Sequence, residues 1–373
     1  MKISYPNYYF DFHCIGGSCE ATCCKGWKIQ IDDDSLKRYK KIKGPFARKI
    51  KEGILWKESC FQLKDQRCAM LNEDGWCDLQ IAMGESALCK TCQTFPRHQE
   101  DFGILQEKML SLSCPEAARL ILFSQKPVTY FLREKEEPIE VTRKRERGIS
   151  STLRKSLLAV RQTIESIYKN QEIPLHVRKI MVTYLVHDVQ LRLEQKHYDK
   201  VEDVLVRYEK KSAAAWFIER FSIEPTDGEI QKKRKQLLHI YRNLELVWPD
   251  WKKNVQKMAN LQNAWERQPI ACREKMDRVG VWFEGIEQAR VNLFLYFLHT
   301  WFLGALYDEQ IEVKMKLILA SCEMIEELAL ANWLENNEMQ KDKKQIWTQA
   351  AWMYARQIEH SDDNLERLET VLP

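Results

Sequence analysis

The chain beyond residue 150 carries apolar residues at the spacing of amphipathic helices. One stripe, spaced 4-3-4-3 behind a capping serine at 150 or 151, runs through Leu153, Leu157, Val160, Ile164 and Ile167. Further stripes join Ile180, Tyr184, His187 and Leu191, then Leu237, Tyr241, Leu244 and Val247, and finally Trp347, Ala350, Tyr354 and Ile358. Glycine is scarce here and no alternating strand pattern is evident. We therefore expect an all-α bundle.

The first part of the chain is less regular. Residues 27–31 alternate well enough for a short strand, and Asp34 or Ser35 can cap a short basic helix after it. A loop-rich unit with so weak a hydrophobic pattern needs another source of stability, and bound metal would supply it. The predicted fold is mainly α, with a loop-rich, cysteine-rich, metal-binding N-terminal domain packed on an all-α helical C-terminal domain.

Cysteine usage divides the chain. Ten of the twelve cysteines lie between Cys14 and Cys114, and a highly charged stretch follows at residues 133–148. We expect a cysteine-rich metal (iron–sulfur) domain over residues 1–125, a charged connection over 126–149 and a helical domain over 150–373.

Export and membrane insertion are not expected. The N-terminal segment shows no signal-peptide pattern. The most apolar run, Val291 to Tyr307, has 17 residues, which is short for a hydrocarbon core of about 30 Å, so we interpret it as a buried helix. A net charge of +4 does not by itself indicate a nucleic-acid or membrane partner. The expected compartment is the cytoplasm, where thiols stay reduced and clustered cysteines more often bind metal.

The cysteine spacing supports metal binding without choosing the metal. Four thiolates suffice for one zinc ion or one iron–sulfur cluster. Cys272 and Cys322 lie in helical segments, and Cys60 is also expected to be structural. A zinc ribbon would show the C-x2-C spacing twice, and only Cys89 and Cys92 have it. Cys24 directly follows Cys23, which breaks the C-x3-C-x2-C spacing of radical methylation and rearrangement enzymes. A zinc deaminase is rejected because its H-x-E motif would have to precede the cysteine pair.

Three cysteine-rich segments carry a family resemblance. DFHCIGGSCEATCCKGWKIQID, CDLQIAMGESALCKTCQTFPR and LSLSCPEAARLIL resemble signature segments of the flagellin lysine-N-methylase family, and VNLFLYFLHTWFLGALYD resembles its helical C-terminal part. A shorter form of the cysteine pattern resembles small domains described as zinc- or iron-chelating. The first resemblance implies methyl transfer from S-adenosylmethionine to lysine ε-amines of flagellin, with a cysteine-bound iron–sulfur cluster, of the 4Fe-4S type, in the enzyme; zinc is the alternative metal.

The resemblance also marks candidate ligands for the metal. Matching positions carry over eight cysteines, and the local C-x2-C spacing adds Cys89. The predicted metal-ligating residues are Cys14, Cys19, Cys23, Cys24, Cys68, Cys77, Cys89, Cys92 and Cys114.

The implied reaction sets physical requirements. A lysine ammonium has no lone pair, so the amine must lose a proton before it attacks a methyl group. Asp11, Glu20 and Glu116 are candidates for this proton transfer, although each also fits a solvated surface carboxylate. The glycine-rich turn of the common nucleotide-binding fold is missing, so S-adenosylmethionine would bind without that fold.

Two other functions stay open. A metal-stabilised binding or redox-sensing module would need the same cysteines without catalysis. Residues 36–51 hold eight basic residues and no acidic one, which fits a phosphate-binding stripe but more often marks the solvated face of a helix. Flagellin is therefore the expected protein partner, and nucleic acid is not.

Overall fold

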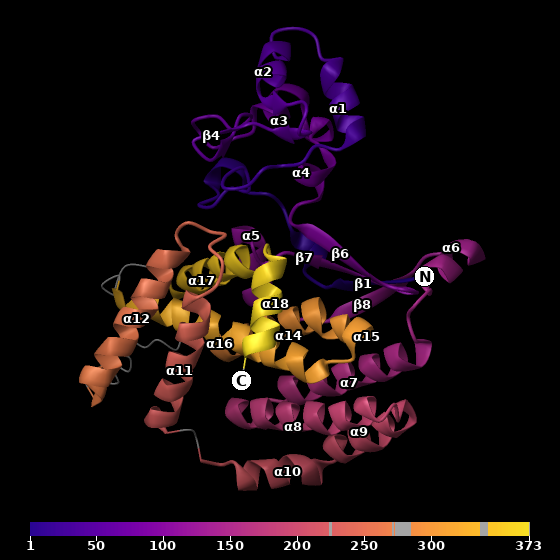
Figure 1. The fold of residues 1–373 in the computed structure, drawn as a ribbon, viewed down its shortest axis with the longest axis vertical. Helices are drawn as coiled ribbons and strands as arrows, with labels where there is room; N and C mark the ends of the chain where they lie inside the picture. The colour runs from indigo at the N-terminus through magenta and orange to yellow at the C-terminus, as the bar shows by residue number, and fades with distance from the viewer. Residues whose placement is uncertain (224–225, 271, 273–284, 336–341, 373) are drawn as a thin grey trace.

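The computed structural model describes residues 1–223, 226–270, 272, 285–335 and 342–372. The chain is mainly helical, as the hydrophobic spacing predicts, and the long helices lie in its second part (Figure 1). These helices are α7 (Ser151–Lys169), α8 (Leu175–Glu194), α9 (Val201–Glu209), α10 (Lys211–Arg220), α11 (Asp227–Arg242), α12 (Trp251–Arg267), α14 (Ile286–Trp301), α15 (Ala305–Asp308), α16 (Ile311–Glu335), α17 (Lys343–Ile358) and α18 (Asp362–Val371).

Helix α7 forms for the reasons that its sequence indicates. The Ser150 side chain accepts a hydrogen bond from the backbone N–H of Leu153 and so caps the first turn. All five residues of the predicted stripe are buried, and so are the four predicted for α17. Most of the apolar run from Val291 is also buried, in α14 and the turns that follow it, whereas Tyr307 at its end is exposed. None of the described helices is both long and apolar enough to cross a membrane.

Helix α8 turns a different face inward from the one predicted. Tyr184 and Leu191 are exposed, whereas Met181, Leu185 and Val189 are buried against α7, α9 and α16. The prediction is wrong because the helix carries apolar residues on all of its faces, so their spacing alone does not identify the buried face. His187 is correspondingly exposed, with a hydrogen bond of 2.5 Å to Glu312 Oε1, and is not a core histidine.

A four-stranded sheet joins the two ends of the N-terminal region. Its order is β6 (Arg97–Phe102), β7 (Leu105–Leu110), β1 (Lys2–Pro6) and β8 (Tyr130–Glu134). β1 pairs parallel with β7 and antiparallel with β8, and β6 pairs antiparallel with β7. The sheet shares one hydrophobic core with the helices. Residues 126–149, expected as an exposed connection, thus contain β8, held by pairing to β1, and α6 (Ile139–Arg145).

The cysteine-rich lobe, defined here as residues 24–95, has a smaller core of its own. Figure 1 shows it projecting from the helical body beyond α5 (Pro115–Leu122). Its elements are α1 (Asp33–Lys40), α2 (Ala47–Glu52), β2 (Ile54–Leu55), β3 (Cys60–Phe61), β4 (Leu63–Lys64), β5 (Arg67–Cys68), α3 (Asp78–Met83) and α4 (Lys90–Thr94).

Two local predictions in this lobe are corrected. Residues 27–31 form no strand, since only Gln30 makes an isolated bridge, to Cys60. Helix α1 is capped by Asp32, whose carboxylate accepts hydrogen bonds from Ser35 N and Ser35 Oγ at 3.0 and 2.8 Å. The cap comes two residues before Asp34 because Asp32 is the last residue with extended backbone and a side-chain acceptor.

Candidate functional site

One group of thiols lies where the N-terminal segment meets α5. We call Cys14, Cys19, Cys23 and Cys114 the α5 sulfur set. Cys114 is the N-cap residue of α5, and burial raises the pKa of its thiol to about 11, with smaller contributions from Cys19 and Cys14. The pKa of Cys23 is raised by a hydrogen bond with Cys24 and by burial, and then by Cys24, Cys14 and Cys114. These mutual effects place the four thiols near one another.

The second group belongs to the core of the lobe. We call Cys24, Cys68, Cys77, Cys89 and Cys92 the lobe sulfur set. The backbone N–H of Cys68 donates to the Cys24 carbonyl at 2.8 Å, and Cys77 forms a bridge with Leu71, so the chain itself gathers these positions.

The thiols of the lobe sulfur set also influence one another. Burial raises the pKa of Cys68 to about 12, and the nearby thiols of Cys24, Cys77 and Cys89 add to it. A hydrogen bond between the side chains of Cys89 and Cys92 lowers the pKa of Cys89 and raises that of Cys92. The thiols of the adjacent Cys23 and Cys24 share a hydrogen bond, and both raise the pKa of Cys92, so the two sulfur sets meet at this pair.

A tight glycine turn brings the two sulfur sets together. Gly16 has φ +52°, and a Cβ there would lie 2.1 Å from the Trp76 ring, which also covers Gly17. Trp76 directly precedes Cys77, so the loop between Cys14 and Cys19 packs on the Cys77 loop. Only glycine permits both this backbone conformation and this approach of the indole.

All twelve cysteines are free thiols. The nine predicted metal ligands fall into the two sulfur sets, whereas Cys60 is fully buried outside them and Cys322 is buried in α16. Within the described residues, no three Cys, His, Asp or Glu side chains close on a single metal ion. The donor chemistry fits a thiolate-bound group, and the ligand set stays a prediction.

Arg356 of α17 ties the α5 sulfur set to the helical body. Its Nε donates to the Ser113 carbonyl at 3.0 Å, and a second guanidinium nitrogen donates to the Ala21 carbonyl. The two acceptors flank the cysteines, since Ser113 precedes Cys114 and Ala21 lies between Cys19 and Cys23. The guanidinium lies 4.9 Å from the Trp248 ring and 4.8 Å from the Trp352 ring. A buried cation thus holds two cysteine-bearing segments together.

A pocket opens beside Arg356. This Trp248 pocket has a volume of about 250 Å3 and is lined by Cys23, Lys25, Gly26, Trp27, Phe95, Ser113, Val247, Trp248, Arg356 and His360. Gln357 of α17 accepts hydrogen bonds from the backbone N–H groups of Val247 and Trp248 and so fixes that wall. On the opposite wall the Trp27 indole donates to the Cys23 carbonyl at 2.6 Å. The pocket therefore lies between the lobe, a thiol of the α5 sulfur set, α17 and the loop that precedes α12.

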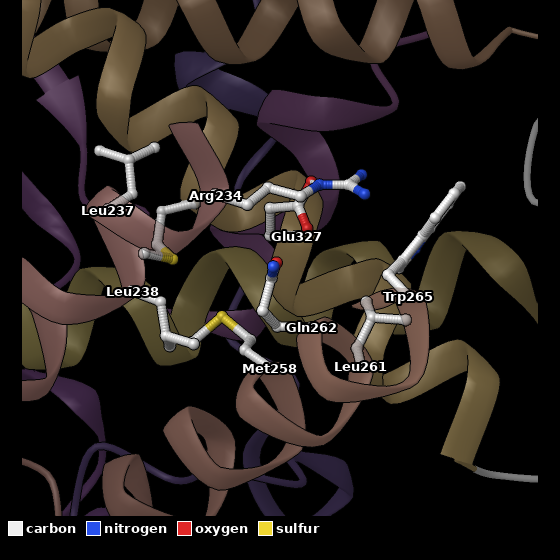
Figure 2. A pocket seen from close by; sticks show the side chains of 9 residues that line it. Arg234, Leu237, Leu238, Met258, Leu261, Gln262, Trp265 and Glu327 are labelled. Atoms are coloured by element: carbon white, nitrogen blue, oxygen red, sulfur yellow. Dashed lines mark hydrogen bonds and ion pairs between the residues drawn. The ribbon is translucent and has the colours of Figure 1, made fainter. Parts of the chain in front are cut away.

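Other cavities are less suited to chemistry. One small cavity, lined by Arg234, Glu327 and mostly apolar side chains (Figure 2), measures about 20 Å3 and accommodates roughly one water. Arg234 and Glu327 are hydrogen-bonded to each other, with Nε and Oε1 2.6 Å apart. A larger space of about 390 Å3 lies between α8 and α16. No cysteine lines either one.

The three predicted catalytic carboxylates lie apart from one another. Glu20 is exposed and accepts a hydrogen bond from Trp352 Nε1 at 3.0 Å, close to Arg356. Glu116, in α5, forms an ion pair with Arg119 at 2.6 Å. Asp11 is exposed in a short 3-10 turn. Glu20 thus hydrogen-bonds α17, the backbone of Glu116 bonds the Cys114 thiol, and none of the three carboxylates lines the Trp248 pocket.

Two residues of the helical part, Arg356 and His360, line the pocket but were not predicted from the sequence. Arg356 and His360 follow Trp352 at four-residue intervals on α17 and just beyond it. This spacing puts a cation and an imidazole on the same helix face as a tryptophan, and it could have marked them as candidate site residues. Burial, and secondly the Arg356 cation, lowers the pKa of His360, although the residue is exposed to solvent.

Fold and site together define a class: a mainly helical protein with a thiol-rich N-terminal lobe whose sulfurs adjoin an aromatic pocket. The sequence profile of the FliB lysine N-methylase C-terminal domain matches residues 161–372. The chain belongs to the FliB lysine N-methylase family.

Curated relatives match over a shorter stretch. The flagellar biosynthetic protein FliU of Salmonella muenchen is 33% identical over 131 residues, which cover 33% of this chain and 78% of FliU. Lysine-N-methylases of Salmonella choleraesuis strain SC-B67 and Salmonella typhimurium strain LT2 are each 33% identical over 131 residues, 33% of this chain and 33% of theirs. The matched segment thus spans a third of these two relatives. No solved structure matches the chain significantly.

Proposed function

We propose that this protein methylates lysine ε-amines of flagellin, with S-adenosylmethionine as methyl donor, in the cytoplasm. The observation that carries this proposal is the family profile, which spans most of the helical part. Two relatives are named lysine-N-methylase and a third is named as a flagellar biosynthetic protein.

We further propose that thiols of the two sulfur sets hold an iron–sulfur cluster of the 4Fe-4S type, with zinc as the alternative metal. Free, gathered thiols support this assignment because thiolates are the ligands that such clusters take. When bound, a cluster supplies a Lewis-acidic or redox-active iron. The α5 sulfur set is the preferred holder because Cys23 lines the Trp248 pocket and Arg356 supplies a buried positive charge beside it.

The residues of this chain have separate tasks in that scheme. Arg356 fixes the segments that carry Cys19, Cys23 and Cys114. The aromatic walls of the pocket shield one side of a bound reacting group from water, which strengthens electrostatic interactions there. Catalysis then rests on holding the amine and the donor methyl group in line.

The test is methyl incorporation. Protein purified without oxygen is incubated with flagellin and S-adenosylmethionine carrying a deuterated methyl group, and flagellin peptides are analysed by mass spectrometry. We expect deuterated methyl groups on lysine residues with the wild type and with the Cys322→Ala variant. Absence of lysine methylation in cluster-loaded protein would contradict the proposal and favour a binding or redox-sensing module.

A further inference from the structure

The walls of the Trp248 pocket are aromatic and free of carboxylates. Trp27, Phe95 and Trp248 supply flat apolar surface, and the ten lining residues include the cations Lys25 and Arg356 but no Asp or Glu. Gly26 lets the lobe approach the indole closely, because a Cβ there would lie 3.0 Å from the Trp248 ring. Trp27 is 41% exposed, so the pocket is reachable from solvent.

The size of the pocket separates the two substrates of the proposed reaction. Sites for drug-sized ligands such as S-adenosylmethionine occupy about 300–1,000 Å3, whereas this pocket measures about 250 Å3. A lysine side chain is an unbranched chain of four methylenes that ends in one amine. It fits the pocket whole and would lay its methylenes along the aromatic walls.

Arg356 does not act as a receptor for an anionic ligand. Two of its nitrogens already donate to the carbonyls of Ser113 and Ala21, and its faces lie against two indoles. The carboxylate of a methyl donor could use only the remaining guanidinium N–H groups, because the two engaged ones hold the α5 sulfur set in place. This engagement favours a ligand without a carboxylate.

The charge of the walls favours a neutral amine. Lys25 and Arg356 disfavour an ammonium nearby, since like charges lower the pKa of a lysine.

We propose that the Trp248 pocket receives the side chain of the target lysine in its neutral form. This inference rests on the proposed function. The amine nitrogen attacks the methyl carbon of the sulfonium donor, the N–C bond forms, and the C–S bond breaks with its electron pair left on sulfur as a thioether. The resulting methylammonium passes one proton to the imidazole of His360, which lines the pocket and, being exposed, hands it on to solvent.

Filling the pocket tests this assignment. Val247→Phe places a larger side chain on the wall, and Val206→Phe makes the same change on exposed α9, 46% exposed and at the far end of the body (Figure 1). For Val247→Phe we expect the KM for flagellin to rise at least tenfold, while the affinity for S-adenosylhomocysteine, measured by calorimetry, changes less than twofold. Val206→Phe should match the wild type in both.

The opposite outcome overturns the proposal. Weaker S-adenosylhomocysteine binding with an unchanged KM would assign the pocket to the donor, and no effect on either would remove it from the site. Lys25→Glu is the second test variant if Val247→Phe fails to fold, because Lys25 is exposed and its replacement should not disturb folding. It should lower kcat/KM several-fold by favouring the ammonium form, whereas Lys64→Glu on β4 should not; equal values for the two variants would contradict the inference.

The two proposals fail in distinguishable ways. If the wild type methylates flagellin but Val247→Phe does so with unchanged KM, only the pocket assignment is wrong. If the wild type does not methylate at all, the proposed function is wrong. Flagellin affinity, compared directly between wild type and Val247→Phe without donor, still tests whether the pocket accepts a flagellin side chain.

Discussion

Replacing Arg356 by methionine is expected to loosen the junction between the α5 sulfur set and α17. Arg356 is 7% exposed and donates to two backbone carbonyls. Hydrogen bonds to a charged group contribute about 1.5–3 kcal/mol each, so the two together amount to about 3–6 kcal/mol. Methionine keeps part of the packing between the indoles, and the adjoining pocket lets water reach the freed carbonyls.

We therefore expect Arg356→Met to lower the free energy of unfolding by about 2–4 kcal/mol. Guanidinium titration measures the loss, and hydrogen exchange should show faster exchange of amides in residues 19–23 and 113–118. Arg48→Met is the matched control, because Arg48 is exposed and its one ion pair within the described part of the chain is with Glu52 on its own helix; it should stay within about 0.5 kcal/mol of the wild type. An Arg356→Met protein as stable as the control, with unchanged exchange in both segments, would refute the reasoning.

Three further changes have definite expected outcomes. Arg161→Met removes the two hydrogen bonds, 2.6 and 2.8 Å long, that the buried Glu107 carboxylate accepts from Arg161. Denaturant titration should show that the free energy of unfolding falls by about 3–5 kcal/mol; a fall below about 1 kcal/mol would contradict this. Burial raises the pKa of Glu359 to about 7 from 4.5, so the folded state binds more protons than the unfolded state between these values. Stability contributed by Glu359, at most about 3 kcal/mol, is full below pH 4.5 and falls as the pH rises through about 7; Glu359→Gln should flatten this slope in pH-dependent melting, and an unchanged slope would count against it. Gly16→Ala meets both a positive φ and an indole, whereas Gly44→Ala at φ +90° meets open space, so Gly16→Ala should cost more, about 2–3 kcal/mol against about 1; equal melting temperatures would contradict the turn argument.

Helical periodicity predicted much of the body of this protein, although α11 ends at Arg242, so Leu244 and Val247 of the predicted stripe lie beyond the helix. Residues 153–167 fit the prediction, because their spacing repeats and a serine caps the first turn. Helix α8 shows the limit of the method, since its apolar residues surround the axis and neighbouring helices decide which are buried. Strand β8 was missed because its pairing with β1 is a contact between distant residues that no local pattern in a charged stretch encodes.

The cysteines were found from composition, but their grouping was not. Cys114 joins Cys14 and Cys19, about a hundred positions earlier, through the fold, and spacing did not show that the two sulfur sets meet at the bonded pair Cys23 and Cys24. Arg356 and Trp248 were missed for the same reason, since a buried arginine between two indoles resembles ordinary helix sequence until the helix packs against the cysteine segments.

The most direct test of the central claim is metal and sulfide analysis of protein purified without oxygen, together with its absorption spectrum. The account predicts a coloured protein that contains iron and acid-labile sulfide, with both lost in Cys23→Ala and Cys114→Ala and retained in Cys322→Ala. Colourless, iron-free protein with stoichiometric zinc, or iron lost only in Cys322→Ala, would contradict it.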